Sequence, residues 1–236
     1  MKEAIILAGG MGTRLREVVP DLPKPMAPVS GKPFLNYLLL WLKKYNFDKL
    51  IISAGYKSDT IVKYFGSAFE DIQIEYAIEK KPLGTGGAVK FALKKTTAKE
   101  ILIVNGDTWF PVDLDKFYSA HQKSKSQFSI ALKEMKNFSR YGSVECRDKT
   151  ILKFNEKKFC SEGLINGGIY LISRHILESG NYPELFSLEK DVLEKEAGSG
   201  TIKCQIFEDP FIDIGIPEDY RKAQTLLNFR SSSHKS

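Results

Sequence analysis

The sequence predicts an α/β protein built around a mostly parallel central sheet. Residues Ala4 to Ala8 form an unbroken apolar run, which is typical of a strand buried on both faces of a parallel sheet. Apolar strand segments then alternate with amphipathic segments of helical length, as Lys49–Ala54 is followed by Ser58–Phe65. A chain of 236 residues is long enough for one large domain. We expect residues 1–229 to form it and residues 230–236 to be a disordered tail.

The first half of the chain reads as strands with near-continuous apolar runs and helices with one apolar face. Asp59 lies in the first turn of one predicted helix, where an acidic residue is favourable. The stretch Pro23-Lys24-Pro25 is predicted to be extended, because proline disfavours a helix on either side of it. The predicted strands are Ala4–Ala8, Lys49–Ala54, Ile72–Ile78 and Glu100–Val104, and the predicted helices are Pro33–Tyr45, Ser58–Phe65 and Ala88–Lys95.

The second half of the chain adds more strands and a hairpin. Polar and apolar residues alternate in residues 140–145 and 150–157, which is the pattern of two antiparallel strands. Pro217 suits the first position of the last helix. The predicted strands are Gln127–Lys133, Leu164–Leu171 and Thr201–Glu208, and the predicted helices are Leu114–Ser124, Glu184–Ala197 and Glu218–Phe229.

A glycine-rich turn follows the first strand and is the main candidate for a binding site. Without Cβ atoms, Gly9, Gly10 and Gly12 let backbone N–H groups surround an anionic oxygen, and the next helix would point its positive end at the same place. Arg14 adds a planar fork of donors. The turn therefore indicates a phosphate site, although a glycine-rich turn without any ligand is the simpler alternative.

Two well-known phosphate loops do not fit this turn. A P-loop ends in Gly-Lys-Ser/Thr, whereas this chain has Gly12-Thr13-Arg14. A dinucleotide-binding loop needs a third glycine where this chain has Leu15, and an acidic residue about twenty positions further on. No acidic residue lies between Asp21 and Asp48, so an NAD-dependent oxidoreductase is disfavoured.

A carboxylate follows the fourth predicted strand. The strand Glu100–Val104 leads into Asn105-Gly106-Asp107, at the carboxyl end where ligands bind in open α/β sheets. Magnesium ions commonly use one or two carboxylates together with phosphate oxygens and water. Asp107 is therefore the first candidate for a metal ligand, against the alternative that the Asn-Gly-Asp stretch is an ordinary turn.

Two segments near the N-terminus together resemble a known family signature. They are Leu7-Ala8-Gly9-Gly10-Met11-Gly12-Thr13-Arg14-Leu15 and Leu22-Pro23-Lys24-Pro25-Met26. This pairing is similar to the signature of sugar-1-phosphate nucleotidyltransferases, and later matches extend the resemblance to about residue 220. The resemblance implies a Rossmann-like three-layer sandwich of the nucleotide-diphospho-sugar transferase type, Mg²⁺ as cofactor, and a nucleoside triphosphate and a sugar 1-phosphate as substrates.

The resemblance also implies which residues bind the nucleotide. A second glycine-rich loop, Leu83 to Gly87, is expected to line the site against the base and ribose. The Glu79 carboxylate could accept hydrogen bonds from the N1–H and N2–H₂ groups of guanine, although it could equally be a surface acid. The implied catalytic residues are Arg14, Lys24, Asp107 and Lys157, and the implied nucleotide-binding residues are Leu7, Ala8, Gly9, Gly10, Gly12, Thr13, Glu79, Gly84 and Thr85.

The resemblance also implies which residues bind the sugar phosphate and the metal. Lys157 is expected to hold the sugar phosphate, with its neighbour Lys158 as a rival, because adjacent strand residues face opposite ways. Asp213 is expected to be the second metal ligand beside Asp107, although Ile216 stands where much of the family has a threonine. The implied sugar-binding residues are Tyr141, Gly142, Glu156, Asn166 and Gly168.

The implied reaction transfers a nucleoside monophosphate to a sugar 1-phosphate and releases pyrophosphate. The motifs most resemble small guanylyltransferases for manno-configured sugars, notably D-glycero-α-D-manno-heptose 1-phosphate, whose products serve surface-polysaccharide synthesis. Uridylyltransferases for N-acetylmuramate 1-phosphate and mannose-1-phosphate guanylyltransferases stay open as alternatives. A regulatory homologue without activity is disfavoured, because Arg14, Lys24, Asp107 and Asp213 are all present.

Composition limits the remaining function classes. The net charge is +6, but the lysines are scattered, so we expect no nucleic-acid partner. Three cysteines without CxxC spacing suggest neither a disulfide framework nor a zinc site. Apolar runs are short and the first strand starts almost at once, so we expect a cytoplasmic protein with no membrane partner. Apolar residues around Phe186 and Leu188, if exposed, would allow a homodimer.

Overall fold

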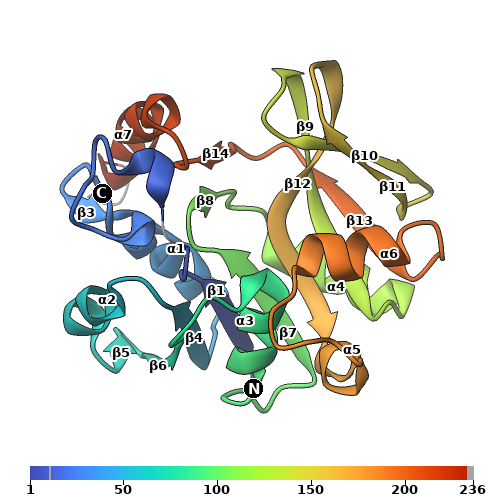
Figure 1. The fold of residues 1–236 in the computed structure, drawn as a ribbon, viewed down its shortest axis with the longest axis horizontal. Coiled ribbons are helices and arrows are strands. Elements are labelled where there is room, and N and C mark those ends of the chain that lie inside the picture. Colours follow the sequence, from blue (N-terminus) through green and yellow to red (C-terminus); the bar gives the residue numbers. More distant parts are fainter. Residues whose placement is uncertain (11, 233–236) are drawn as a thin grey trace.

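Strand β1 (Glu3–Leu7) lies inside the parallel part of the central sheet (Figure 1). It pairs in parallel with β4 (Lys49–Ala54) on one side and β7 (Glu100–Asn105) on the other, and β4 pairs in parallel with β6 (Ile72–Ile78). The computed structural model that shows this describes residues 1–10 and 12–232. The predicted strands in this half of the chain are confirmed to within one residue at each end.

The other half of the sheet is mainly antiparallel. Its long strands, β9 and β12, pair with each other, and β12 also pairs antiparallel with β7. The strands of this half are β9 (Phe128–Phe138), β10 (Gly142–Arg147), β11 (Thr150–Lys157), β12 (Cys160–Ser173) and β13 (Ile202–Phe207). At the opposite edge of the sheet, β5 (Ala68–Phe69) lies beside β6. The full order of the ten-stranded sheet is β10-β11-β13-β9-β12-β7-β1-β4-β6-β5. The continuous parallel part of the sheet is β7-β1-β4-β6, and β13 and β9 form one further parallel pair.

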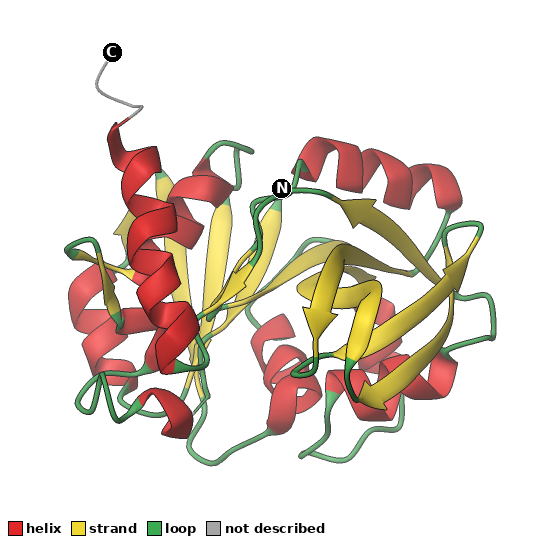
Figure 2. Ribbon diagram, turned by 90° about the horizontal axis from the view of Figure 1, so that it is seen from above, coloured by secondary structure: helices red, strands yellow, loops and turns green. Residues whose placement is uncertain are grey.

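Helices cover both faces of the sheet and form the expected three layers (Figure 2). One buried cluster combines Ile6 with residues of α1, α2, α4 and α7, and the other combines Ile5 with residues of α3 and α5. Successive strand residues face opposite sides, so one strand contributes to both clusters. The helices are α1 (Phe34–Lys43), α2 (Ser58–Phe65), α3 (Gly84–Leu93), α4 (Leu114–Ser124), α5 (Arg174–Ser179) and α7 (Pro217–Ser232).

Short elements connect the sheet to its edges. A two-stranded sheet joins β8 (Thr108–Trp109) to β14 (Ile212–Asp213), and another joins β2 (Pro28–Val29) to β3 (Lys32–Pro33). In Figure 1, β14 crosses from the β9–β12 side of the molecule to α7. Single 3₁₀ turns occur at Thr13–Leu15 and Lys24–Met26.

Three local predictions are wrong. Lys24–Met26 is a 3₁₀ turn and not extended, because proline fits the start of a helical turn and Ala27 N–H reaches Lys24 O at 2.9 Å. The predicted helix Glu184–Ala197 is instead a π-helical turn at Leu188–Leu193 followed by α6 (Glu194–Glu196). The last helix continues to Ser232 and so includes part of the predicted tail, whose final residues, 233–236, lie outside the described residues.

The predicted hairpin is confirmed, and its turn has a clear physical basis. Strands β10 and β11 pair antiparallel, and Arg147 lies opposite Thr150. The two residues between them, Asp148 and Lys149, have φ values of 49° and 59°. Positive φ at both central residues is the geometry of a two-residue hairpin turn that matches the twist of the strands.

Among the described residues, no helix is both long enough and apolar enough to cross a bilayer.

The start of β1 is held by a buried carboxylate. Glu3 is fully buried and accepts hydrogen bonds from the N–H groups of Thr97 (2.6 Å) and Ala98 (2.8 Å), and Lys49 Nζ lies 3.2 Å from it. Burial opposes ionisation, but the two N–H groups and Lys49 outweigh it, so the pKa of Glu3 lies below its usual value. The carboxylate thus ties β1 to β4 and to the segment before β7.

We expect Glu3→Ala to lower the free energy of unfolding by about 3 kcal/mol, because it leaves the Lys49 ammonium buried without this partner. Urea denaturation at neutral pH measures the change, and Glu208→Ala, at an exposed position, is the matched control. Because the folded-state pKa is depressed, the difference between wild type and variant should shrink as the pH falls through that pKa. Equal stability of the two proteins at neutral pH would contradict the role of Glu3.

Candidate active site

The glycine turn after β1 is anchored by the neighbouring strands. Ala8 N–H donates to Ser53 O at 2.7 Å, and Leu7 O accepts from Gly106 N–H at 2.9 Å. Gly12 has a φ of +62°, a left-handed conformation that glycine adopts without strain. The expected helix after the turn is only the 3₁₀ turn Thr13–Leu15, in which Leu15 is buried and the Arg14 side chain is exposed. The turn therefore presents its backbone, and Arg14, at the edge of the sheet.

Lys24 links the glycine turn to the carboxylate after β7. Its Nζ lies 3.0 Å from Asp107 Oδ2. A Cβ added to Gly12 would lie 2.8 Å from Lys24 Cγ, so the lysine stem packs directly against this glycine. The three residues come from separate parts of the sequence, and their contact supports the predicted site.

The two predicted metal ligands are brought together by the β8–β14 pairing. Asp213 lies opposite Thr108 in this small sheet, and Ile214 N–H donates to Asp107 O at 3.0 Å. Burial, and then the neighbouring charge of Asp107, raise the pKa of Asp213. The N–H of Gly215 stabilises the Asp213 carboxylate at 2.7 Å. A carboxylate whose pKa is raised by burial and by a second carboxylate marks a place where a cation is electrostatically favoured.

Glu79 lies beside the glycine turn, as predicted for a base-binding residue. A Cβ added to Gly9 would lie 2.6 Å from Glu79 Oε1. Ser53 Oγ donates to Oε1 at 3.1 Å, and Leu83 N–H donates to Oε2 at 3.3 Å. Burial raises the pKa of Glu79, whereas these two hydrogen bonds favour its charged form. The carboxylate is fixed in orientation and still has acceptor capacity for a ligand.

The second glycine-rich segment forms the first turn of α3 and not a loop. Gly86 N–H donates to Phe186 O at 3.0 Å, and a Cβ on Gly84 or Gly86 would lie within 2.4 Å of Phe186 atoms. These glycines therefore allow the chain around Phe186 to pack against the helix. Phe186 is 3% exposed and Leu188 is 0% exposed, so neither of these two residues provides the predicted exposed apolar surface for a dimer.

Thr85, a predicted nucleotide contact, directs its side chain toward the segment after α5. Its hydroxyl donates to Glu189 Oε2 at 2.5 Å and accepts from Leu188 N–H at 2.9 Å. Asn166, a predicted sugar contact, is joined to the same glutamate through the buried Tyr170. The fold thus connects the predicted nucleotide side and the predicted sugar side.

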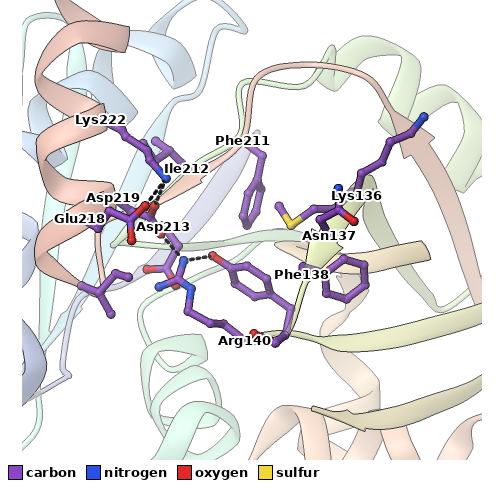
Figure 3. Close-up of a pocket in the computed structure, with 14 residues that line it drawn as sticks. Lys136, Asn137, Phe138, Arg140, Phe211, Ile212, Asp213, Glu218, Asp219 and Lys222 are labelled. Atoms are coloured by element: carbon purple, nitrogen blue, oxygen red, sulfur yellow. Dashed lines mark hydrogen bonds and ion pairs between the residues drawn. The ribbon is translucent and has the colours of Figure 1, made fainter. Parts of the chain in front are cut away.

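The predicted sugar residue Tyr141 lines a pocket of about 410 Å³, whose other residues include Arg140, Asp213 and Asp219 (Figure 3), and Gly142 follows Tyr141 at the start of β10. Tyr141 forms one wall, and Asp213 lies in the same lining. Arg140 extends toward Asp219 and forms an ion pair with it, and the same guanidinium donates to Tyr141 Oη at 2.9 Å. Burial, and then the charge of Asp213, raise the pKa of Tyr141. The phenol therefore stays protonated beside the carboxylates.

The remaining predicted sugar residues lie on β11 and β12 and are not part of the lining of this pocket. Lys157 ends β11 directly opposite Gly142, whereas the rival Lys158 lies just beyond the strand. Glu156 and Lys157 are both exposed. Gly168 has a φ of +72° at an irregularity in the pairing of β12 with β9, and its N–H donates to Asn166 Oδ1 at 2.9 Å. The irregularity in the β12–β9 pairing and the predicted sugar contact thus occupy the same place.

Sequence reasoning missed four residues that organise the site: Ser53, Arg140, Glu189 and Asp219. Arg140 directly precedes the Tyr141-Gly142 pair, so its position in the sequence was a usable signal. Asp219 lies in the first turn of α7, where an acidic residue also fits a helix terminus. Glu189 lies in a segment that looked like a solvated helix, and only the close packing on α3 brings it to the site.

Two known proteins are similar to this chain over nearly its whole length. The protein from Aneurinibacillus thermoaerophilus named D-glycero-alpha-D-manno-heptose 1-phosphate guanylyltransferase is 51% identical over 225 residues, which cover 95% of this chain and 98% of the relative. A protein of the same name from Campylobacter jejuni is 45% identical over 219 residues, covering 92% of this chain and 96% of the relative.

A solved structure and a family model are also similar to this chain. The crystal structure of HddC from Yersinia pseudotuberculosis complexed with GMP-PN has a TM-score of 0.85 and 38% identity, and covers 96% of this chain and 100% of that one. Residues 3–228 match the Nucleotidyl transferase family. The match spans the glycine turn, Lys24, both carboxylates and the strands around the pocket, and the chain belongs to the Nucleotidyl transferase family.

Proposed function

We propose that the protein transfers GMP from GTP to D-glycero-α-D-manno-heptose 1-phosphate and releases pyrophosphate. The observation that carries this proposal is the convergence of Lys24, Asp107 and Asp213 beside the glycine turn, at one edge of the sheet. The substrate assignment rests on the relatives of that printed name, which this chain matches over nearly their whole length. The product would be an activated sugar for surface-polysaccharide synthesis in the cytoplasm.

The reaction requires the approach of two anions. An oxygen of the sugar phosphate forms a bond to the α-phosphorus of GTP, and the bond between that phosphorus and the oxygen bridging to the β-phosphate breaks. The attacking oxygen is already anionic, so no general base is needed. Catalysis must therefore come from charge neutralisation and from holding the attacking and leaving oxygens in line.

The chain supplies cations and N–H donors for each part of this arrangement. The glycine turn and the exposed Arg14 would bind the leaving pyrophosphate. Lys24, which now contacts Asp107, would neutralise charge near the α-phosphate. Lys157, opposite Gly142 in the hairpin, would bind the phosphate of the sugar substrate. Tyr141, Glu156 and Asn166 would contact the sugar itself.

The carboxylates of Asp107 and Asp213 fit a magnesium ion. Burial, and then the charge of Asp107, raise the pKa of Asp213, and a magnesium site commonly uses one or two carboxylates of the protein. When bound, the metal would neutralise phosphate charge as a Lewis acid. Lys24 and Arg140 offset part of the same negative charge in the protein alone.

Glu79 supports guanine as the base. Its carboxylate lies against Gly9 and is oriented by Ser53 and by Leu83 N–H. A fixed carboxylate can accept from both donors on the Watson–Crick edge of guanine, whereas uracil offers only one. A homodimer remains a prediction, but it can no longer rest on Phe186 and Leu188.

The substrates are tested by measuring pyrophosphate release with each of GTP, UTP, CTP and dTTP against a panel of sugar 1-phosphates. We expect GTP with D-glycero-α-D-manno-heptose 1-phosphate to give the highest kcat/KM. Mannose 1-phosphate and N-acetylmuramate 1-phosphate represent the two alternatives. A preference for UTP with N-acetylmuramate 1-phosphate would contradict both the base and the sugar.

We expect Arg14→Ala and Asp107→Ala each to reduce the rate of pyrophosphate release about a hundredfold, because each removes one electrostatic contact of about 2.7 kcal/mol. Steady-state kinetics at saturating substrates measure the loss. The matched control is Arg16→Ala, whose guanidinium stacks on Tyr56 at 4.8 Å and should leave the rate within about twofold of wild type. Near-normal turnover of either active-site variant would refute the role given to that residue.

Gly12→Ala is expected to lower kcat/KM for GTP by about tenfold or more, because a left-handed alanine costs about 1–2 kcal/mol and its methyl group displaces the Lys24 stem. Gly10→Ala is the comparison, since its added Cβ meets nothing within 4 Å. A smaller loss in Gly10→Ala supports the contact between Gly12 and Lys24. Equal losses would mean that any methyl group in the turn is harmful.

A further inference from the structure

A chain of hydrogen bonds runs from the first turn of α3 to the irregular part of β12, and Glu189 is its centre. Glu189 Oε2 accepts from Thr85 Oγ1 at 2.5 Å and from Ser187 Oγ at 3.0 Å. Glu189 Oε1 accepts from Tyr170 Oη at 3.2 Å. Tyr170 Oη in turn accepts from Asn166 Nδ2 at 2.9 Å. Glu189 therefore links one element of the nucleotide side to one of the sugar side.

The direction of each hydrogen bond in this chain follows from the carboxylate. An ionised glutamate can only accept, so the single phenol hydrogen of Tyr170 must point to Glu189. The phenol oxygen is then left as an acceptor, which requires the NH₂ group of Asn166 and not its carbonyl. Burial, and then the charge of Glu189, raise the pKa of Tyr170, so the phenol keeps its hydrogen. Tyr170 is 1% exposed, so water does not compete for it.

The other end of the Asn166 amide fits the same orientation. Asn166 Oδ1 accepts a hydrogen bond from Gly168 N–H at 2.9 Å, and Gly168 has a φ of +72°. A flipped amide would place two donors together at Gly168 and leave the Tyr170 oxygen without a donor. Asn166 is only partly buried, and one hydrogen of Nδ2 is used by Tyr170. Among the described residues the second hydrogen has no acceptor, so it is available to a ligand.

We propose that Glu189 is a positioning residue that, through Tyr170, holds the Asn166 amide so that an N–H group faces a hydroxyl oxygen of the sugar. The inference rests on the proposed sugar 1-phosphate substrate. In this arrangement the sugar side of the site selects a sugar hydroxyl that can accept a hydrogen bond from Asn166. The first turn of α3 belongs to the same rigid unit. Glu189 acts through other residues and is not itself placed against the reacting atoms.

The test is the variant Glu189→Gln, which keeps the size of the side chain but can donate as well as accept. We expect the KM for the sugar 1-phosphate to rise about tenfold, the effect of losing one hydrogen bond. The KM for GTP and kcat should stay within about twofold of wild type. Glu194→Gln, the same change at an exposed position of α6, is the matched control and should change neither KM.

Two further variants separate positioning from a loss of folding. Tyr170→Phe removes only the phenol oxygen and should reproduce the tenfold rise even if Glu189→Gln proves unstable by thermal denaturation. In an Asn166→Ala background, Glu189→Gln should cause no additional rise in the KM for the sugar 1-phosphate. Additive effects of the two substitutions would overturn the proposal, because independent losses do not pass through Asn166.

The outcomes also separate this inference from the proposed function. A wild-type protein that releases no pyrophosphate with any sugar 1-phosphate would overturn both. An active wild type whose KM for the sugar is unchanged in Glu189→Gln and in Tyr170→Phe would overturn the positioning role alone. Equal increases in both KM values would also overturn it, since they would indicate a general structural effect.

Discussion

The parallel pairing of β1 with β4 and β7 is the constraint on which the rest of the structure depends. Ile5 and Ile6 face opposite clusters, so helices must cover both faces of the sheet. The carboxyl ends of parallel strands then meet at one edge. Gly9 follows β1, Glu79 follows β6 and Asp107 follows β7 at this edge. The proximity of the candidate nucleotide site residues is thus a consequence of how the core is buried.

Charge balance is the second organising feature of the site. Asp107 and Asp213 lie near each other because β8 and β14 pair, although this raises the pKa of the partly buried Asp213. Lys24 compensates from the N-terminal side, and Arg140 from the hairpin side. The site therefore holds both signs of charge at close range. Such an arrangement is better suited to binding a metal cation together with phosphate groups than to binding the cation or the phosphates alone.

The two glycine-rich segments look alike in the sequence but serve different physical purposes. Gly12 is needed for its left-handed backbone and for the close approach of Lys24. Gly84 and Gly86 make room for the chain at Phe186, which packs against the first turn of α3. This close packing brings Glu189 into contact with Thr85. Glycine at these positions therefore helps to connect the two sides of the site.

From the sequence we could predict the α/β class, the glycine turn after β1 and most element boundaries, because these depend on local hydrophobic patterns and on backbone chemistry. The motif residues Arg14, Lys24 and Asp107 could also be named from it, since each lies beside a recognisable turn or strand end. The folded chain alone sets the antiparallel half of the sheet and brings Asp107 near Asp213. It also decided the links from Arg140 to Asp219 and from Glu189 to Asn166. These features join residues far apart in the chain, and no local pattern records which distant side chain will become a neighbour.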